Sequence, residues 1–500
     1  MEDRYAQLVE RLGEVQDIAG AAGVLAWDQR TKMPEAGAGA RADQLATLTR
    51  LAFERFTADE IGTLLDELHD WGESLDYDSV EASLLRMTRR DYDKARRVPL
   101  ELRAEMARAG ALSEPVWREA RRKSDFELFR PHLEQAVELK KRYIECFQPV
   151  DEPYDALLDD FEPGMKTAEV RTVFDELKAG LVPLVAEIAE RTDAVDDSAL
   201  SGDFPLEGQE KVENEILRTF GFFDEEWRLD ETAHPFASKG GPHDVRLTTH
   251  HHGDNLTSIF ACMHEFGHGL YEYQVDHALY RTPLGRGASL GVHESQSRMW
   301  ENMIGRSLPF WERYFDTVEG AFPGRFNGLG AEGFYRAVNR VRPSLIRIHA
   351  DECTYNLHII LRFELEQDLV SGRLAPADAR EAWDAKIEEY LGIDVPDVAD
   401  GVLQDMHWAG GAIGYFPTYA LGNVISGQLW ERIRRELPDL DEQTRAGEFG
   451  ALREWLRENV HRHGRKFMPG ELLERMVGKG LDPQPLLGYL REKFGAIYSL

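Results

Sequence analysis

The sequence predicts a mainly α-helical fold that contains a very small β-sheet. Three observations lead to this expectation. Apolar residues recur at helical spacing over most of the 500 residues, and only one short segment alternates in the manner of a strand. The hydrophobic content of 42%, with 10% aromatic residues, is enough to build a large core and argues against a disordered chain.

The helical pattern begins near the start of the chain. Residues 5–26 form the first helical segment, which ends before Pro34, and the pattern continues from 38 to 147 with charged residues on the outward faces. A further helix includes residues 170–181. Nearly everything after residue 344 has the same helical pattern.

Two segments interrupt this pattern. Residues 244–249 alternate and carry β-branched side chains, so they are the best candidate for a strand. Residues 193–208 are acidic, small and turn-rich, which is typical of a surface linker. We therefore expect residues 1–500 to form a single domain, with two helical lobes that divide near residues 193–208.

A candidate metal site lies in the segment Leu256–Tyr273. As a helix, this segment would bury an apolar stripe, while His264 and His268 would lie one turn apart on another face. Two imidazoles so placed can hold one tetrahedral zinc ion, and Glu265 beside them can take a proton from a metal-bound water. The HExxH spacing therefore predicts a zinc-dependent hydrolase.

HExxH alone is a weak signal, because matches of five residues arise by chance. Catalytic zinc usually has three protein ligands and one position for water. Glu294 is the best third ligand, since the 26 residues after His268 let the chain leave one helix and return on a second. We interpret the triplet His250-His251-His252 as a solvated or hydrogen-bonded loop.

The charge balance excludes two classes of partner. The chain has 90 acidic and 59 basic residues, and its net charge of −31 fits either a salt-loving host or an ordinary acidic protein. A surface so negative repels nucleic acid and anionic lipid. The first residues do not resemble a signal peptide, and no apolar run could span a bilayer. We expect a cytoplasmic protein that binds neither nucleic acid nor membrane.

Seven motifs, spread over most of the chain, resemble those of the carboxypeptidase Taq family of thermostable zinc metallocarboxypeptidases, and they occur in the family's order. Several motifs in this order are far more specific than HExxH alone. The motifs are Trp27-Asp28 with Met33-Pro34, His234-Pro235-Phe236, Asp244-x-Arg246-x-Thr248, His264-Glu265-x-x-His268, His293-Glu294-Ser295-Gln296, Ile346-Arg347 through Ala350-Asp351, and Gly401 through Gln404-Asp405-x-His407-Trp408.

The resemblance implies a large helical metallopeptidase with a deep central groove, similar in shape to neurolysin, so that residues 1–500 would be a single peptidase catalytic domain. It also implies release of single residues from peptide C termini with broad specificity, a homodimer, and zinc or sometimes cobalt. The chain departs from the family at residues 250–252 and at Tyr273, where glutamine is expected. These departures concern substrate contact rather than the chemistry.

The expected reaction uses zinc on His264, His268 and Glu294, which would lower the pKa of a bound water from 15.7 to about 7. Glu265 would take its proton and pass it to the leaving amine. In the related enzymes a Gly-rich, Tyr-bearing loop covers the zinc, and residues 409–419 resemble it.

Further residues are candidates for contact with substrate or ligands. His407, just before the Gly-rich stretch, and Tyr419 within it are candidates to stabilise the oxyanion, with Tyr415 as the alternative to Tyr419, although either tyrosine could be a packed aromatic. Arg347 and Arg246 are candidates to bind the substrate carboxylate.

Other interpretations remain open for the charged residues. Arg347 lies four residues before Asp351, the spacing of an ordinary ion pair within a helix. Asp405 and Glu301 are candidates to orient the ligand imidazoles. The same zinc site would also serve an endo-oligopeptidase, and in a non-catalytic metal-binding scaffold Glu265 would have no chemical role.

Overall fold

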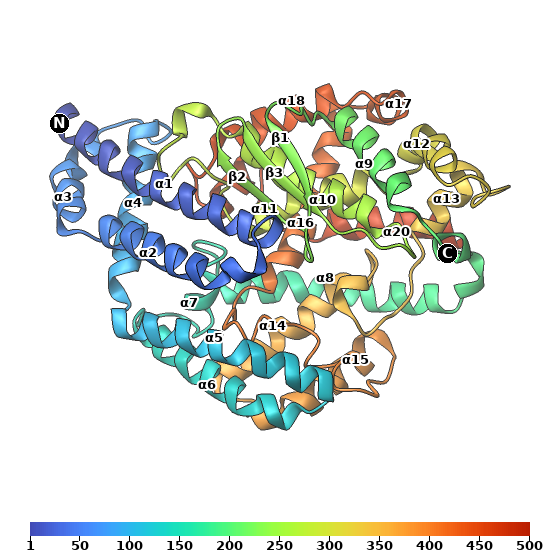
Figure 1. Ribbon diagram of the computed structural model, residues 1–500, viewed down its shortest axis with the longest axis horizontal. Helices are drawn as coiled ribbons and strands as arrows, with labels where there is room; N and C mark the ends of the chain where they lie inside the picture. The colour runs from blue at the N-terminus through green and yellow to red at the C-terminus, as the bar shows by residue number, and fades with distance from the viewer.

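The predicted fold class is confirmed by a computed structural model, which describes all residues from 1 to 500. The chain folds into twenty α-helices and one three-stranded sheet. The two ends of the chain lie at opposite ends of the long axis of the molecule (Figure 1).

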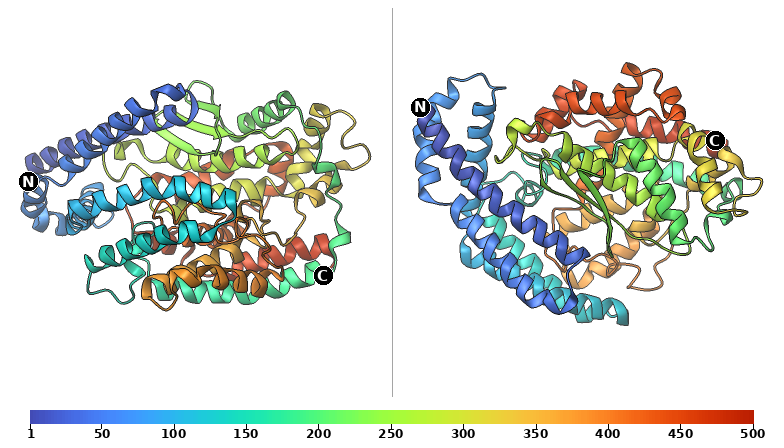
Figure 2. Two further views of the ribbon diagram at one scale, coloured as in Figure 1. Left: turned by 60° about the horizontal axis from the view of Figure 1, so that its bottom comes forward. Right: turned by 45° about the horizontal axis from the view of Figure 1, so that its top comes forward.

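The first four helices form a group at the amino-terminal end, drawn in blue at the left of Figures 1 and 2. This group has a small core of 13 residues, three of which, Val275, Leu279 and Leu284, come from the rest of the chain. The helices of the group are α1 (Glu2–Thr31), α2 (Ala38–Phe56), α3 (Asp59–Glu73) and α4 (Val80–Arg97).

Two large cores hold the rest of the molecule together. The helices of the first core are α5 (Leu100–Lys123), α6 (Phe126–Glu145), α7 (Asp155–Leu158), α8 (Thr167–Ala189), α14 (Tyr355–Ser371), α15 (Ala379–Leu391) and α20 (Gln484–Tyr498). The helices of the second core are α9 (Leu206–Phe220), α10 (Thr257–Gln274), α11 (Leu290–Arg298), α12 (Leu308–Ala321), α13 (Gly330–Val338), α17 (Leu440–Ala446), α18 (Gly450–Asn459) and α19 (Pro469–Val477).

Helix α16 (Pro417–Glu436) contributes to both large cores, because its buried residues up to Val424 belong to the first and those from Ile425 onward to the second. The chain also passes from the first core at Val195 to the second at Phe204. The single catalytic domain with a division near residues 193–208 stays a prediction, as does the deep groove.

The sheet is small and lies against α10. Its strands are β1 (Trp227–Glu231), β2 (Ala237–Gly241) and β3 (Asp244–Thr249), in the order β1-β3-β2, with β3 parallel to β1 and antiparallel to β2. The strand expected at residues 244–249 is confirmed. The flanking strands were not predicted, because one alternates only weakly and the other has the sequence Ala-Ser-Lys-Gly-Gly.

The expectation that nearly everything after residue 344 is helical is wrong for residues 392–416, which contain no helix. Pro396 cannot donate a backbone hydrogen bond, and Gly411 and Gly414 adopt positive φ angles of 72° and 103°. This irregular segment carries the motif Gly401–Trp408 with His407 and most of the Gly-rich stretch, while Tyr419 lies in the first turn of α16 (Pro417–Glu436).

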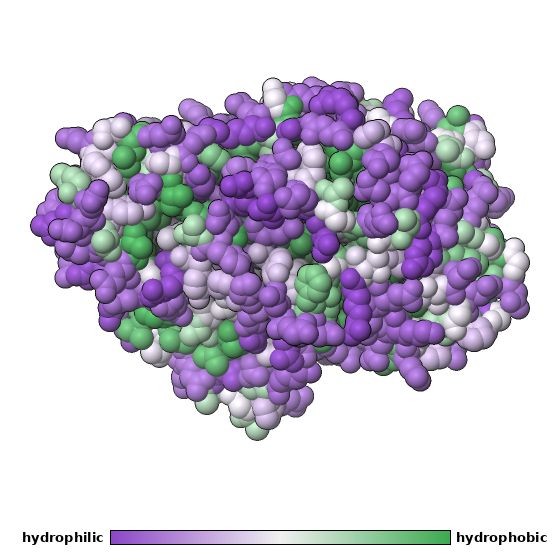
Figure 3. All heavy atoms as spheres, turned by 90° about the horizontal axis from the view of Figure 1, so that it is seen from above, coloured by the Kyte–Doolittle hydropathy of each residue, from purple (hydrophilic) through white to green (hydrophobic).

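The face of the molecule in Figure 3 is mostly hydrophilic, and its apolar side chains are scattered in patches. None of the helices combines the length and the apolar character needed to cross a bilayer.

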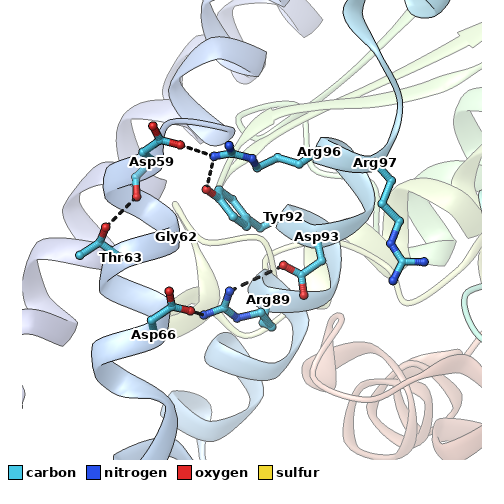
Figure 4. A pocket seen from close by; sticks show the side chains of 9 residues that line it. All are labelled: Asp59, Gly62, Thr63, Asp66, Arg89, Tyr92, Asp93, Arg96 and Arg97. Carbon is cyan, nitrogen blue, oxygen red and sulfur yellow. Dashed lines mark hydrogen bonds and ion pairs between the residues drawn. The ribbon is translucent and has the colours of Figure 1, made fainter. Parts of the chain in front are cut away.

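A surface cavity of about 540 Å³ lies between α3 and α4 (Figure 4). Its walls are mostly charged: Arg89 pairs with Asp66, and Arg96 contacts both Asp59 and Tyr92. None of the predicted site residues lines this cavity, so it is separate from the candidate site.

Candidate metal centre

Helix α10 carries the three predicted HExxH residues. The apolar stripe expected from Ile259 to Leu270 is buried, which fixes the helix against the second core. The opposite side of the helix therefore turns His264, Glu265 and His268 toward α11.

Two glycines allow the helices of the site to pack closely. A Cβ atom on Gly267 of α10 would lie 2.5 Å from the carbonyl oxygen of Gln296 on α11. A Cβ atom on Gly422 of α16 would lie 2.6 Å from the side chain of Glu294. Any other residue at either position would push Glu294 away from α10 or α16.

The structure brings the three predicted ligands together. The Nε2 atoms of His264 and His268 lie 3.7 Å and 3.5 Å from Oε2 of Glu294, and the three donor atoms are within 4.8 Å of one another. Burial lowers the pKa of His268 to about 4, so its ring is neutral at neutral pH. A neutral imidazole has the lone pair that a metal ligand needs.

The outer side of His264 faces a carboxylate, as hypothesised for Glu301. Its Nδ1 lies 2.9 Å from Oε2 of Glu301, which belongs to the π-helical segment Met299–Ile304 directly after α11. Arg298 donates to Glu294 at 2.8 Å and to Glu301 at 3.1 Å. Although burial opposes ionisation, Arg298 and His264 hold the pKa of Glu301 at about 2. Glu301 is therefore a charged acceptor for the His264 ring.

Glu265 is buried beside the triad, with 6% of its surface exposed, and its Oε2 has no hydrogen-bond partner. Burial raises the pKa of Glu265 to about 7, and the charges of Glu294 and Glu301 add to this shift. An unpaired buried carboxylate oxygen with a raised pKa is a typical proton acceptor of an active site.

The three candidates for the oxyanion site lie together. Nε2 of His407 is 3.3 Å from the hydroxyl of Tyr419, and the rings of Tyr415 and Tyr419 are 5.3 Å apart between centroids. Burial raises the pKa of both tyrosines, and the charge of Glu294 contributes to each shift. Both hydroxyls therefore stay protonated at neutral pH and can donate hydrogen bonds. The effect of the Glu294 charge on both pKa values shows that the two tyrosines lie near the triad.

Arg347 is buried and pairs with Asp405, not with Asp351. Its Nε and Nη2 donate to Oδ1 of Asp405 at 3.1 Å and 2.8 Å, and its Nη1 donates to the hydroxyl of Tyr355 at 3.1 Å. The alternative of an ion pair within a helix is wrong. Arg347 lies in the single 3₁₀ turn Arg347–His349, and α14 starts only at Tyr355.

Tyr355 connects Arg347 with the triad. The Arg298 guanidinium lies 4.4 Å from the centroid of the Tyr355 ring, and Arg298 also donates to Glu294. The Arg347 guanidinium lies 5.0 Å from the centroid of the Tyr419 ring. Arg347, Tyr419 and the triad are thus parts of one contiguous cluster.

Arg246 lies elsewhere. It donates twice to Asp244, at 2.8 Å each, and its guanidinium lies 4.5 Å from the centroid of the Trp27 ring. Its strand neighbours Val245 and Leu247 face α10, so Arg246 points to the other face of the sheet. The structure does not bring Arg246 together with the triad.

The histidine triplet after β3 is hydrogen-bonded through its middle residue. Nε2 of His251 lies 3.0 Å from Oε2 of the buried Glu213 on α9. This geometry confirms the interpretation of His251 as a hydrogen-bonded residue. The triplet does not belong to a group of potential metal ligands.

Comparison with known proteins identifies the family. The model of the carboxypeptidase Taq (M32) metallopeptidases matches residues 7–494. The chain belongs to this family. Thermostable carboxypeptidase 1 of Thermus thermophilus is 42% identical to it, over 100% of this chain and 99% of the relative. Carboxypeptidase 1 of Bacillus subtilis is 38% identical, also over 100% and 99%.

Solved structures of carboxypeptidases have the same fold. The M32 carboxypeptidase from Deinococcus radiodurans superimposes with a TM-score of 0.95 at 40% identity, over 100% of both chains. The Pyrococcus furiosus carboxypeptidase superimposes with a TM-score of 0.96 at 37% identity, over 99% of both chains. The chain is therefore a metallocarboxypeptidase, a peptide hydrolase, and this contradicts the hypothesis of a non-catalytic scaffold.

Membership of the carboxypeptidase Taq family implies a divalent metal ion, and the residues of this chain fit one. His264, His268 and Glu294 offer two imidazole nitrogens and one carboxylate oxygen, the donor set of zinc hydrolases that keep a fourth position open. The unpaired oxygen of Glu265 lies beside this set.

Sequence reasoning missed Arg298, Tyr355 and Arg362 of the carboxypeptidase Taq site, and it gave Asp405 the wrong partner. Arg298, four residues after Glu294, could have been found from helical spacing. Arg362, which is fully buried, is distant in sequence from its partner. The hypothesis that Asp405 orients a ligand imidazole is wrong, because its Oδ1 accepts from Arg347 and its Oδ2 from Arg362.

Proposed function

We propose that this carboxypeptidase Taq family member releases single residues from the C termini of peptides with broad side-chain specificity. The observation that carries the proposal is the contiguous cluster of the donor triad, the unpaired oxygen of Glu265 and Arg347. We propose zinc as the metal on His264, His268 and Glu294, because two imidazoles and one carboxylate are a donor set of catalytic zinc, with cobalt as the alternative that the family resemblance implies.

Glu265 is the proposed general base. A divalent ion held by the triad would polarise the peptide carbonyl and lower the pKa of a coordinated water. Oε2 of Glu265 accepts the proton of the attacking water and then delivers it to the amine of the departing residue. Its burial supports this role, because a carboxylate with a pKa near 7 can both accept and release a proton at neutral pH.

His407 and Tyr419 are proposed to stabilise the negative charge that develops on the carbonyl oxygen. Their hydrogen bond holds the Tyr419 hydroxyl in place before substrate arrives. The raised pKa of Tyr419 keeps this hydroxyl protonated, so that it can donate to the oxyanion. Tyr415 is the alternative donor, because its ring contacts that of Tyr419.

Arg347, rather than Arg246, is proposed to bind the C-terminal carboxylate of the substrate. A guanidinium has five N–H donors. Asp405 accepts one N–H from Nε and one from Nη2 of Arg347, and the Tyr355 hydroxyl accepts one from Nη1. Two of the five donors are therefore left for a carboxylate. Asp405 and Tyr355 also fix the plane of the guanidinium, as bidentate recognition requires.

The proposal extends to assembly and location. The resemblance to the family supports a homodimer, and we propose that it acts on peptides in the cytoplasm. Light scattering after size-exclusion chromatography would give the mass of the assembly, and a value of one chain would contradict the dimer.

A mass-spectrometric time course on one N-terminally blocked, unstructured peptide tests the function. A ladder that loses one residue at a time from the C terminus is the expected result, and the C-terminally amidated form of the same peptide should resist cleavage. Internal fragments from both forms would instead support the endo-oligopeptidase alternative. An intact peptide across zinc, cobalt and salt conditions would contradict the proposal.

A further inference from the structure

The two ligand histidines differ in what holds their outer nitrogens. Nδ1 of His264 faces the carboxylate of Glu301 directly. Nδ1 of His268 instead lies 2.7 Å from Nδ1 of His293, which is the residue directly before the ligand Glu294. Nε2 of His293 then lies 3.0 Å from Oε1 of Glu272. An imidazole thus separates Nδ1 of His268 from the carboxylate of Glu272.

The proton positions in the hydrogen-bonded series His268, His293 and Glu272 follow from metal coordination. Two ring nitrogens 2.7 Å apart need one proton between them, because two lone pairs or two N–H groups would repel each other. Nε2 of His268 faces Oε2 of Glu294, where the metal would bind, so the lone pair of Nε2 must be free. The proton of the neutral His268 ring therefore lies on Nδ1. His268 is therefore the donor to Nδ1 of His293.

The tautomer of His293 is fixed in turn. Since Nδ1 of His293 accepts, its own proton must lie on Nε2, where it donates to Oε1 of Glu272. Glu272 follows His268 by four residues on α10, so the two side chains lie on one face of the helix. The ring of His293, from α11, fills the space between them.

Glu272, the last member of this hydrogen-bonded series, is held in place by further contacts. Oε1 of Glu272 also accepts the backbone N–H of Gly287 at 3.0 Å, and its Oε2 lies 3.8 Å from Nζ of Lys239. Lys239 comes from β2 and donates to the backbone carbonyl of Glu272 at 2.7 Å. The His293 ring packs beside Tyr271, with centroids 5.1 Å apart. Three elements, β2, α10 and α11, therefore hold His293 and Glu272 in place.

We propose that His293 and Glu272 form a positioning relay for His268, which fixes the tautomer and the ring orientation that metal binding requires. The inference rests on the proposed function of the triad as the metal site. Neither residue belongs to the group of potential metal ligands. Both act through His268, as the outer partners of ligand histidines do.

The relay makes a specific prediction about metal affinity. His293→Leu removes the acceptor for His268, and we expect the dissociation constant for zinc to rise about 10- to 100-fold. His293→Asn should recover part of the loss, because the amide oxygen of asparagine lies near the position of the histidine Nδ1 and can accept the same proton. Glu272→Gln should cost less than His293→Leu, because a glutamine oxygen can still accept from Nε2 of His293.

A matched control separates the relay from packing. His461 is fully buried and its ring contacts the same Tyr271, with centroids 4.9 Å apart, but it hydrogen-bonds to Gln274 and Gln296 and not to a ligand. His461→Leu therefore removes a comparable buried ring outside the relay. We expect it to lower the Tm of the metal-free protein while zinc affinity stays close to that of the parent.

The test is zinc competition with a chromophoric chelator, together with the visible spectrum of the cobalt-loaded protein and the Tm of the metal-free protein. A lower zinc affinity and an altered cobalt spectrum in His293→Leu, with partial recovery in His293→Asn, support the relay. Parent-like zinc affinity in His293→Leu, or an equal loss in His461→Leu, overturns it. If the parent protein itself fails to bind one zinc ion per chain, the proposed metal site fails instead.

Discussion

The metal triad and the Arg347 cluster are contiguous in space but are built in opposite ways. The triad comes from two helices, and its donor atoms face one another with a proton acceptor beside them. The Arg347 cluster comes from a 3₁₀ turn, α14 and the irregular segment 392–416, and both oxygens of Asp405 are already bonded. The triad is arranged to bind a metal ion, and the second region is arranged to hold the Arg347 guanidinium in a fixed position.

This difference gives the two regions different sensitivities. Small changes in the triad should alter the chemistry without unfolding the protein, because its donor atoms are arranged to bind an ion rather than to hold one another. Removing a charge from the Arg347 cluster should cost stability, because its partner is then left buried and unpaired.

Glu265→Gln should have the largest effect on the chemistry. We expect kcat to fall about a hundredfold to ten-thousandfold, because an amide cannot accept the proton of the attacking water. The bound metal should remain, since Glu265 is not a ligand. Peptide hydrolysis and the metal content by atomic absorption check both parts, with the exposed Glu127→Gln as control. Near-parent kcat in metal-loaded Glu265→Gln would contradict the proposed role.

Asp405→Ala should have the largest effect on stability. It leaves Arg347 and Arg362 buried without a counter-charge, so we expect the free energy of unfolding to fall by about 3–5 kcal/mol. Asp78→Ala is the matched control, because it breaks an exposed pair with Arg475 and should cost about 0–1 kcal/mol. Denaturant unfolding measures both, and equal losses would show that the cluster does not differ from a surface pair.

Glu366 should make the second region sensitive to pH. This fully buried carboxyl accepts from the hydroxyl of Tyr154 at 2.5 Å, from Nε1 of Trp408 at 2.8 Å and from the N–H of Gly414 at 2.9 Å. Its contacts hold the segment that carries His407. Burial nevertheless raises the pKa of Glu366 to about 7.

The sign of the pH effect follows from this raised pKa. The native protein keeps a proton on Glu366 at pH values where the unfolded chain, with a pKa of about 4.3, has lost it. The contribution of Glu366 to stability is therefore complete below about pH 4 and is lost as the pH rises through about 7, by up to about 3 kcal/mol. Denaturant unfolding from pH 5 to 8 should show this slope in the parent and a smaller slope in Glu366→Gln; identical slopes would contradict the assignment.

Arg347→Lys should have a smaller effect on stability, because it keeps the charge beside Asp405, and its main effect should be on substrate recognition. Lysine keeps the charge but loses the planar fork, so kcat/KM on peptides with a free C terminus should fall about 10- to 100-fold, equal to about 1.5–3 kcal/mol. The preference over the amidated peptide should shrink by a similar factor. Arg246→Lys is the comparison variant, and a larger loss there would reverse the choice between the two arginines.

The same contrast explains how much could be predicted from the sequence. The triad was predictable because its residues lie at helical spacing, His264 to His268, and because Glu294 follows on the next helix. The strand at residues 244–249 was also predictable from local alternation. Each of these features depends on residues that are close in the chain.

The Arg347 cluster was less predictable, because its partners are distant in sequence and lie outside regular helix. The spacing from Arg347 to Asp351 suggested an ion pair, but the chain is not helical there, and the true partner, Asp405, follows 58 positions later. The orientation of Arg246 could have been expected from strand alternation, since Val245 and Leu247 are apolar and must face the core. The contact between His268 and His293 leaves no local signature.

The π-helical segment Met299–Ile304 places Glu301 beside the His264 ring. This placement depends on the number of residues in the turn as well as on their types. A π-helix has a wider turn than an α-helix and commonly marks one extra residue in the chain. Deleting one residue between Arg298 and Glu301 would turn every later side chain of this helix by about 100° relative to α11. The Glu301 carboxylate would then rotate off the His264 ring although no residue of the site had been replaced. Single-residue gaps in this turn are therefore the changes to look for when relatives of this enzyme differ in how firmly they hold their metal.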